Sequence, residues 1–237
     1  MHRGKKMRID PTQIKGIYNY LPQGAVILQL GLYKDRLAIE KEVLEDTIER
    51  IVLYQYNDCY YITSLKEDKG LIEVRYNEKL VLEEVNYFKT VHLDRQSTYQ
   101  ILVGGKKESD SLKEELSILQ PSEDTIKSIA EMPIYFDRVE IQHIQDTEQI
   151  IVWLSKELEA YTITFYRLQD GKIVEGGWDE TIYFKKVVQY YKYLVEAYPK
   201  VMLYRTYLRE AEQRIQGSEV LYKKGKRCKK CQQYKKI

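Results

Sequence analysis

The chain has 237 residues, of which 43% are hydrophobic and 31% are charged, and its formal net charge is +2. A chain of this length forms one large domain or two of about 100–120 residues, and this much apolar material excludes global disorder. The start MHRGKKMRID has no apolar stretch behind it, and three cysteines provide no disulfide framework. We therefore expect a cytoplasmic protein without a secretory signal or a membrane-spanning segment.

The first part of the chain is predicted to be mostly strands. Ile14, Ile17 and Leu21 recur at helical spacing after Pro11, which predicts a short helix over 11–21. Apolar and aromatic runs then predict strands over 24–33, 37–43, 48–56, 59–65, 70–76 and 99–103, with a hairpin turn around Asp68–Gly70 and a strand end at Gly104-Gly105.

Two further stretches favour helices or loops. Residues 79–92 are compatible with a helix or a strand, and the spacing of Val81, Val85, Phe88 and Val91 fits a helix better. The polar stretch 104–124 is predicted to be a connector that carries a short helix from Ser111 to Leu119.

The second part of the chain is predicted to be a β-meander followed by two helices. Ser122 or Asp124 can cap a helix over Thr125–Glu131. Strands are predicted over 138–144, 148–154, 160–168 and 172–176, with a hairpin turn at Asp170-Gly171. Apolar stripes of period 3.6 then run from Phe184 to Tyr198 and from Val201 to Ile215, and we expect these two helices to cover the preceding sheet.

Four short motifs occur twice, in the same order, at offsets of roughly 100 residues. Ile14–Ile17 returns as Ile126–Ile129, Glu49–Leu53 as Glu148–Val152, Asp68–Glu73 as Asp170–Glu175, and Tyr87–Val91 as Tyr183–Val187. Ordered internal matches indicate a duplicated unit; the alternative is chance matching in a chain rich in Ile, Lys, Glu and Tyr. The prediction is an α+β fold of two related halves, each an antiparallel β-meander with helices, over 1–110 and 121–221, followed by a basic tail over 222–237.

Charge is divided unevenly along the chain. Residues 1–8 carry four basic side chains and residues 222–237 carry eight, and neither segment contains an acidic residue. Removing these twelve from the 38 basic residues leaves 26 against 36 acidic residues in 9–221, a formal charge of −10. An acidic body repels phosphates, so contacts with nucleic acid should come through the ends of the chain.

The tail contains the clearest chemical motif, Cys228-Lys229-Lys230-Cys231. Two cysteines at this spacing can bind one Zn²⁺, and nearby lysines favour the thiolate form that binds metal. A structural zinc site needs four ligands, so one hypothesis is a site shared between two chains, with Cys228 and Cys231 from each. A redox pair and an incidental motif are the alternatives.

The basic residues of the tail are also candidates for contacts with nucleic acid. Those at the predicted site are Lys223, Lys224, Lys226, Arg227, Lys229 and Lys230. The same composition could instead dock on an acidic partner or on the protein's own body, or serve only as a charged end. Outside the tail, Cys59 lies in an apolar strand and is predicted to be a small buried side chain.

The motifs of common enzyme classes are missing from the sequence. It contains no G-x-x-x-x-G-K-[ST], G-x-S-x-G or H-E-x-x-H motif. The leading interpretation is a non-enzymatic cytoplasmic binding protein of the inhibitor, immunity or regulatory-adaptor type, whose acidic body, rich in the 22 tyrosines, engages a basic macromolecular partner. The alternative is a nucleic-acid-associated protein that uses the tail, with zinc at the cysteine pair. An enzyme with a cleft between the halves is a third class.

Overall fold

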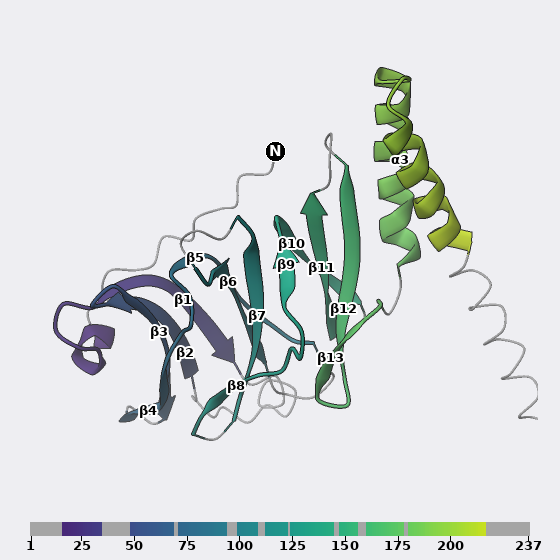
Figure 1. The fold of residues 1–237 in the computed structure, drawn as a ribbon. Helices are drawn as coiled ribbons and strands as arrows, with labels where there is room; N and C mark the ends of the chain where they lie inside the picture. Colours follow the sequence, from purple (N-terminus) through teal and green to yellow (C-terminus); the bar gives the residue numbers. More distant parts are fainter. Residues whose placement is uncertain are drawn as a thin grey trace, which may run out of the picture. The chain divides into compact units, whose positions relative to one another are not determined.

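The computed structural model describes residues 16–34, 48–68, 71–93, 99–108, 112–122, 124–144, 147–155, 160–177 and 180–216. Within these residues the fold is α+β, as predicted: three antiparallel sheets are accompanied by two α-helices (Figure 1). The chain divides into two compact units, the first formed by 1–136, 146–148 and 168–173 and the second by 137–145, 149–167 and 174–237.

The first sheet is a four-stranded meander in the first unit. Its strands, in the order in which they pair, are β1 (Val26–Lys34), β2 (Ile48–Tyr56), β3 (Cys59–Asp68) and β4 (Leu71–Lys79). These confirm four of the predicted strands, whereas the strand predicted over 37–43 lies outside the described residues. β2 and β3 are joined by a tight turn in which Asn57 and Asp58 have positive φ, as short hairpin turns require.

A short segment before β1 covers one face of this sheet. It contains the 3-10 helix η1 (Tyr18–Tyr20), so the predicted helix is confirmed for its described part only. Ile17, Leu21 and Ala25 pack from this segment onto the buried residues Val52, Tyr54 and Leu65. The segment is therefore held against the sheet by apolar burial.

The second sheet packs on the other face of the first. Its strands are β5 (Glu84–Val91), β6 (Gln100–Lys106), β7 (Glu114–Pro121), β8 (Ile126–Ser128) and β9 (Ile134–Phe136), with β8 and β9 pairing at different positions along β7. Ile51, Leu53 and Ile62 of the first sheet share a core with Ile101 and Val103 of the second. The central strands β2 and β3 are thus buried on both faces along 51–54 and 62–65, and their polar inner residues must find partners.

Three predictions for this region were wrong. The helix predicted over 79–92 is strand β5, the helix predicted within 104–124 is strand β7, and the helix predicted over Thr125–Glu131 contains strand β8. In β5 the pairing skips Asn86, because Val85 lies opposite Gly105 and Tyr87 lies opposite Gly104. This β-bulge turns Val85 and Phe88 to the same side of a strand, which imitates the three-residue spacing of a helix.

The glycine pair predicted to end β6 lies inside it instead. A Cβ on Gly105 would lie 1.7 Å from the carbonyl oxygen of Glu84, and a Cβ on Gly104 would lie 2.5 Å from the ring of Phe136. Both positions therefore require glycine. The bulged backbone of β5 lies against Gly105, and the ring of Phe136 lies against Gly104.

The third sheet is a second four-stranded meander. Its strands, in the order in which they pair, are β10 (Arg138–Ile144), β11 (Thr147–Ser155), β12 (Tyr161–Gln169) and β13 (Lys172–Glu175). All four confirm the prediction. So does the turn at Asp170-Gly171, where both residues have positive φ.

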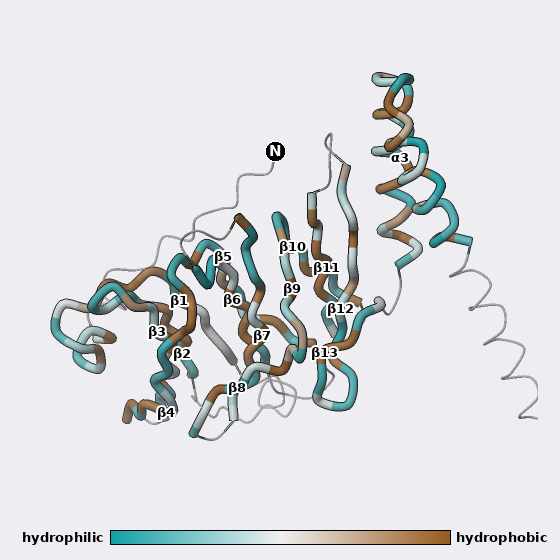
Figure 2. The backbone as a smooth tube through the Cα atoms, viewed as in Figure 1, coloured by the Kyte–Doolittle hydropathy of each residue, from teal (hydrophilic) through white to brown (hydrophobic). Residues whose placement is uncertain are grey.

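Two helices cover this sheet within the second unit, as predicted. The helix α3 (Thr181–Ala197) ends before Pro199, and a second helix follows over 202–216. Phe184, Val187 and Tyr191 join Ile163 and Phe165 of β12 in one core. In Figure 2 hydrophobic positions recur along both helices between hydrophilic ones, which is the pattern of helices buried on one side.

The repeated motifs occupy equivalent elements in part. Glu49–Leu53 lies in β2 and Glu148–Val152 in β11, the second strands of the two meanders. Tyr87–Val91 is a strand, whereas Tyr183–Val187 is helical. The first compact unit includes β7 and β8 and extends to Phe136 before the chain enters the second unit.

Candidate functional site

The predicted tail site lies outside the described residues. This applies to Lys223, Lys224, Lys226, Arg227, Cys228, Lys229, Lys230 and Cys231, which stay predictions. Cys59 begins β3 as predicted and is a free cysteine, but it is half-buried rather than fully buried. In the described part of the chain, His, Cys, Asp and Glu side chains form no group of three that could hold a metal ion.

The most concentrated polar cluster surrounds Glu49, a β2 residue with only 6% of its surface exposed. One carboxylate oxygen of Glu49, Oε1, accepts hydrogen bonds from the Ser64 hydroxyl, from Arg75 at 2.8 Å and from the Tyr99 hydroxyl at 2.7 Å. Glu49 points inward because it alternates with the buried Ile51 and Leu53 along the strand. Three donors compensate the carboxylate for its loss of water.

Arg75 reaches this carboxylate because it lies at a bulge in β4. Ser64 pairs with Tyr76 and Leu65 with Val74, so Arg75 is the extra residue between them. Bulges re-aim side chains in this way. The other terminal nitrogen of Arg75 donates to the carbonyl oxygen of Ser122 at 2.8 Å, which ties the first sheet to the segment after β7.

The Tyr99 hydroxyl acts as a hydrogen-bond donor in this cluster. Burial raises the pKa of Tyr99 well above its ordinary value, and the neighbouring Tyr76 and Glu49 raise it further. Burial is also the main cause of the raised pKa of Tyr76. Both hydroxyls therefore keep their protons at neutral pH and cannot serve as general bases. The arrangement holds two sheets together and stabilises one buried charge.

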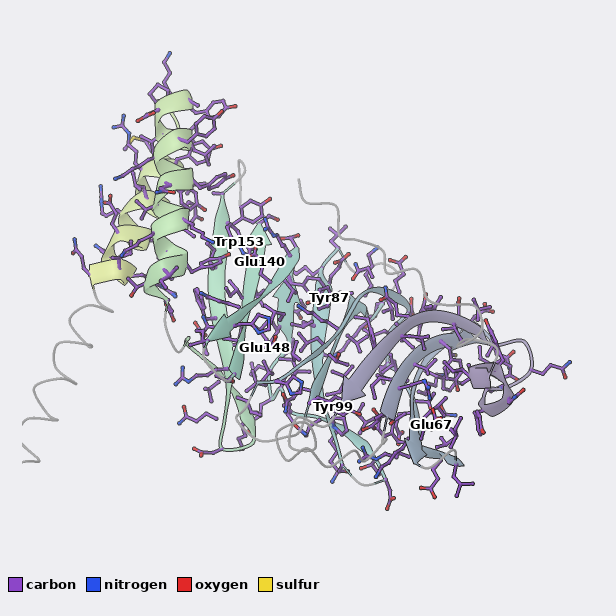
Figure 3. The ribbon with its side chains drawn as sticks, turned by 180° about the vertical axis from the view of Figure 1, so that it is seen from behind. Glu67, Tyr87, Tyr99, Glu140, Glu148 and Trp153 are labelled. Carbon is purple, nitrogen blue, oxygen red and sulfur yellow. The ribbon has the colours of Figure 1, made fainter. Side chains whose placement is uncertain are left out.

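A second buried carboxylate, Glu148, occupies the position in β11 that corresponds to Glu49 in β2. It is 7% exposed and accepts the backbone N–H of His92 at 2.6 Å, while its own N–H donates to the carbonyl of His92. Burial raises the pKa of Tyr87 to about 12, with a contribution from the charge of Glu148. Figure 3 labels Glu148, Tyr87 and Tyr99. His92 and Tyr99 flank the β5–β6 connection, so each carboxylate holds one end of it.

An aromatic cluster lies between the third sheet and α3 in the second unit. The ring of Trp153 meets those of Tyr161 and Tyr183 edge to face, with ring centres 5.5 and 5.8 Å apart. The guanidinium of Arg138, which is paired with Glu140, lies 5.3 Å from the centre of the Trp153 ring. An internal cation thus already occupies the face of this ring.

Four large side chains just before β1 and within it are exposed. We call the group formed by Tyr18, Tyr20, Val26 and Leu28 the tyrosine surface; these residues are 44%, 40%, 55% and 39% exposed. Leu28 is turned outward by a bulge, because Ile27 pairs with Tyr54 and Gln29 with Leu53. These four residues lie within positions 18–28 of the sequence and are candidates for an interaction site.

The sequence predicts a tyrosine-rich binding body but does not identify the residues of the tyrosine surface, although part of the signal is present. Ile17 and Leu21, four residues apart, are the inward positions of the predicted helix. Tyr18 and Tyr20, which lie between them, must then point outward. The outward turn of Leu28 had no sequence signal, because a bulge depends on strand pairing.

No family model matches the chain, and comparisons with curated proteins and with solved structures also found no match. Of the helices in the described residues, none has the length and hydropathy needed to cross a membrane.

Proposed function

We propose that this protein is a non-enzymatic cytoplasmic binding protein whose acidic, tyrosine-rich β region engages a basic macromolecular partner, in the manner of an inhibitor, immunity protein or regulatory adaptor. The observation that carries the proposal is the tyrosine surface. Tyrosine is favoured at protein interfaces because its ring buries a large area while its hydroxyl finds a polar partner. Val26 and Leu28 are exposed aliphatic residues that would add to the contact area.

The distribution of charge favours a basic partner. Residues 9–180, which contain the strands of the described part of the chain, hold 19 basic and 32 acidic side chains, a formal charge of −13. Complementary charge speeds association and rejects wrong partners more than it adds affinity. We therefore assign the affinity to the tyrosine surface and the choice of partner to the acidic residues of the β region.

The rigid backing of the tyrosine surface also supports a binding role. The segment that carries Tyr18 and Tyr20 is anchored on both sides, by Ile17 before it and by Leu21 and Ala25 after it. Anchoring reduces the conformational entropy that the surface would lose when a partner binds.

The experiment is affinity capture from the protein's own cells with three forms of the full chain. The first is wild type. The second carries Tyr18→Ser, Tyr20→Ser and Leu28→Ser. The third is a control with Leu71→Ser, Val81→Ser and Met132→Ser, which are exposed apolar residues elsewhere in the first unit. We expect a basic protein to be retained by wild type and the control and lost with the second form. Equal retention by all three forms contradicts the proposal.

We further propose that the two four-stranded meanders arose by duplication of one unit. Support comes from their matching strand order and from the buried glutamates at corresponding positions, Glu49 and Glu148. In each meander one copy of a repeated motif spans the junction between the third and fourth strands. These copies are Asp68–Glu73 and Asp170–Glu175. If this is correct, Glu148→Gln and Glu49→Gln should destabilise the protein by similar amounts in urea unfolding. A large difference would favour chance similarity of the motifs.

A further inference from the structure

The C-terminal helix pair carries its own basic surface, distinct from the acidic β region. Residues 181–237 hold 15 basic and four acidic side chains, a formal charge of +11. Seven of the basic and three of the acidic side chains lie in 181–216, which gives the described helices a formal charge of +4. We propose that the exposed face of α3 binds single-stranded nucleic acid.

The helical period gathers the relevant side chains of α3 on one face. Exposed residues recur at intervals of three and four: Ile182, Lys185, Lys186, Gln189, Lys192, Tyr193 and Glu196. The opposite face is buried and consists of Tyr183, Phe184, Val187, Val188, Tyr191 and Leu194. The exposed face therefore presents three lysines and one glutamate to solvent, with a helical scaffold that packing holds in place.

These lysines are available to a ligand. Within the described part of the chain, no carboxylate lies within ion-pairing distance of Lys185, Lys186 or Lys192. Arg214 of the second helix shows the contrast, because it is paired with Glu180 at 3.1 Å and stacks on the ring of Phe184. Among the described residues the three lysines thus have no ion-pair partner and can neutralise phosphates, whereas Arg214 has a structural role.

An exposed tyrosine lies among these lysines. Tyr193 is 66% exposed and follows Lys192 directly, and Tyr198 is exposed at the end of the same helix. A tyrosine ring beside cationic side chains suits a strand whose bases are unpaired, because each base can stack on the ring while the backbone meets the lysines. Stacking of this kind requires single-stranded rather than duplex nucleic acid, in which the bases are already stacked.

The test is fluorescence anisotropy with the full chain and a labelled DNA or RNA strand of about 20 nucleotides, across a salt series. The helix variant carries Lys185→Gln, Lys186→Gln and Lys192→Gln, which preserve helix propensity. The control carries Lys66→Gln, Lys89→Gln and Lys127→Gln, which remove the same charge from exposed positions of the β region. A tail variant carries Lys223→Gln, Lys224→Gln, Lys229→Gln and Lys230→Gln.

Each phosphate contact on a single strand contributes about 0.7 to the slope of log affinity against log salt. The helix variant should therefore lower the slope by about 2 and weaken binding roughly 100-fold at about 0.1 M salt. The control should bind within about twofold of wild type after correction for net charge. Tyr193→Ala should weaken binding about fivefold or more, and duplex DNA of the same length should bind more weakly than single strands.

Three outcomes would overturn the proposal. In one, wild type does not bind single strands. In another, the tail variant loses binding while the helix variant keeps it, which would assign binding to the tail alone. In the last, sedimentation shows a salt-sensitive dimer that requires the three α3 lysines and that nucleic acid does not dissociate. The α3 face would then bind the acidic β region of a second copy rather than nucleic acid.

Discussion

The hydroxyl of Tyr191 on α3 forms two hydrogen bonds with the backbone of Tyr161 at the start of β12. It accepts from the N–H at 2.9 Å and donates to the carbonyl oxygen at 3.0 Å. One hydroxyl thereby satisfies both backbone polar groups of a strand residue and fixes the helix pair on the third sheet.

Removing this hydroxyl should destabilise the second unit. Tyr191→Phe keeps the ring but leaves two backbone groups without this partner, so we expect the free energy of unfolding to fall by about 1–3 kcal/mol. Tyr193→Phe, at an exposed position of the same helix, should change it by less than about 0.5 kcal/mol. Urea unfolding followed by circular dichroism compares the two. Equal effects would mean that the hydroxyl of Tyr191 contributes nothing to stability.

Glu49→Gln should lower the free energy of unfolding more than the removal of a more exposed ion pair does. The substitution removes the charge that Arg75, Ser64 and Tyr99 share, and we expect a loss of about 2–4 kcal/mol. Glu67→Gln removes the partner of Arg50 at a more exposed site and should cost less than about 1 kcal/mol. Urea unfolding of both variants is the measurement. If Glu49→Gln lowers the free energy of unfolding no more than Glu67→Gln does, the hydrogen bonds around Glu49 do not stabilise the protein.

Gly105→Ala tests the close approach of β5 and β6. The new methyl would meet the carbonyl oxygen of Glu84, which cannot move without breaking the pairing of the two strands. We expect a loss of more than about 3 kcal/mol, or failure to fold. Gly16→Ala is the matched control, because nothing lies within 4 Å of its Cβ position and the residue is helical. It should be neutral or stabilise by up to about 1 kcal/mol. Tolerance of Gly105→Ala would show that the bulge can relax.

The stability of the protein should fall above pH 10. Burial raises the pKa of Tyr87 to about 12 from an ordinary value of 10.0, so the unfolded chain releases this proton first as the pH rises. The stabilising contribution is complete below pH 10 and is lost through pH 12, at up to about 1.4 kcal/mol per pH unit.

The matching experiment compares Tyr87→Phe with Tyr135→Phe in urea unfolding between pH 9 and 12. The first variant should lose stability less steeply than wild type above pH 10, because Phe has no proton to release. The second, at an exposed position, should follow wild type. Parallel curves for all three proteins would contradict the assignment of Tyr87.

The elements predicted correctly from the sequence are those with strong local signals. The apolar stripe of α3 and the Asp170-Gly171 turn each specify their structure without reference to distant residues. The strand β7 was missed because Leu, Lys and Glu favour helix locally, whereas the pairing of β7 with β6 on one side and with β8 and β9 on the other decides its conformation.

The site was less predictable than the fold for a similar reason. The inward direction of Arg75 and the outward direction of Leu28 both depend on bulges, which exist only once two strands are in register. The partners of Glu49 lie 15, 26 and 50 residues away in sequence, so no local pattern connects them. The acidic and basic regions, by contrast, are visible in the sequence itself.

The most direct test of the proposed function is the affinity of the captured partner for the purified full chain, measured by calorimetric titration at two salt concentrations. We expect the variant with Tyr18→Ser, Tyr20→Ser and Leu28→Ser to bind at least about tenfold more weakly than wild type, because exposed aromatic residues dominate interface energies. The control with Leu71→Ser, Val81→Ser and Met132→Ser should bind as tightly as wild type. Added salt should lower the affinity of wild type and of this control by the same factor. Equal affinity of all three proteins, or the failure of wild type to bind any captured protein, would contradict the account.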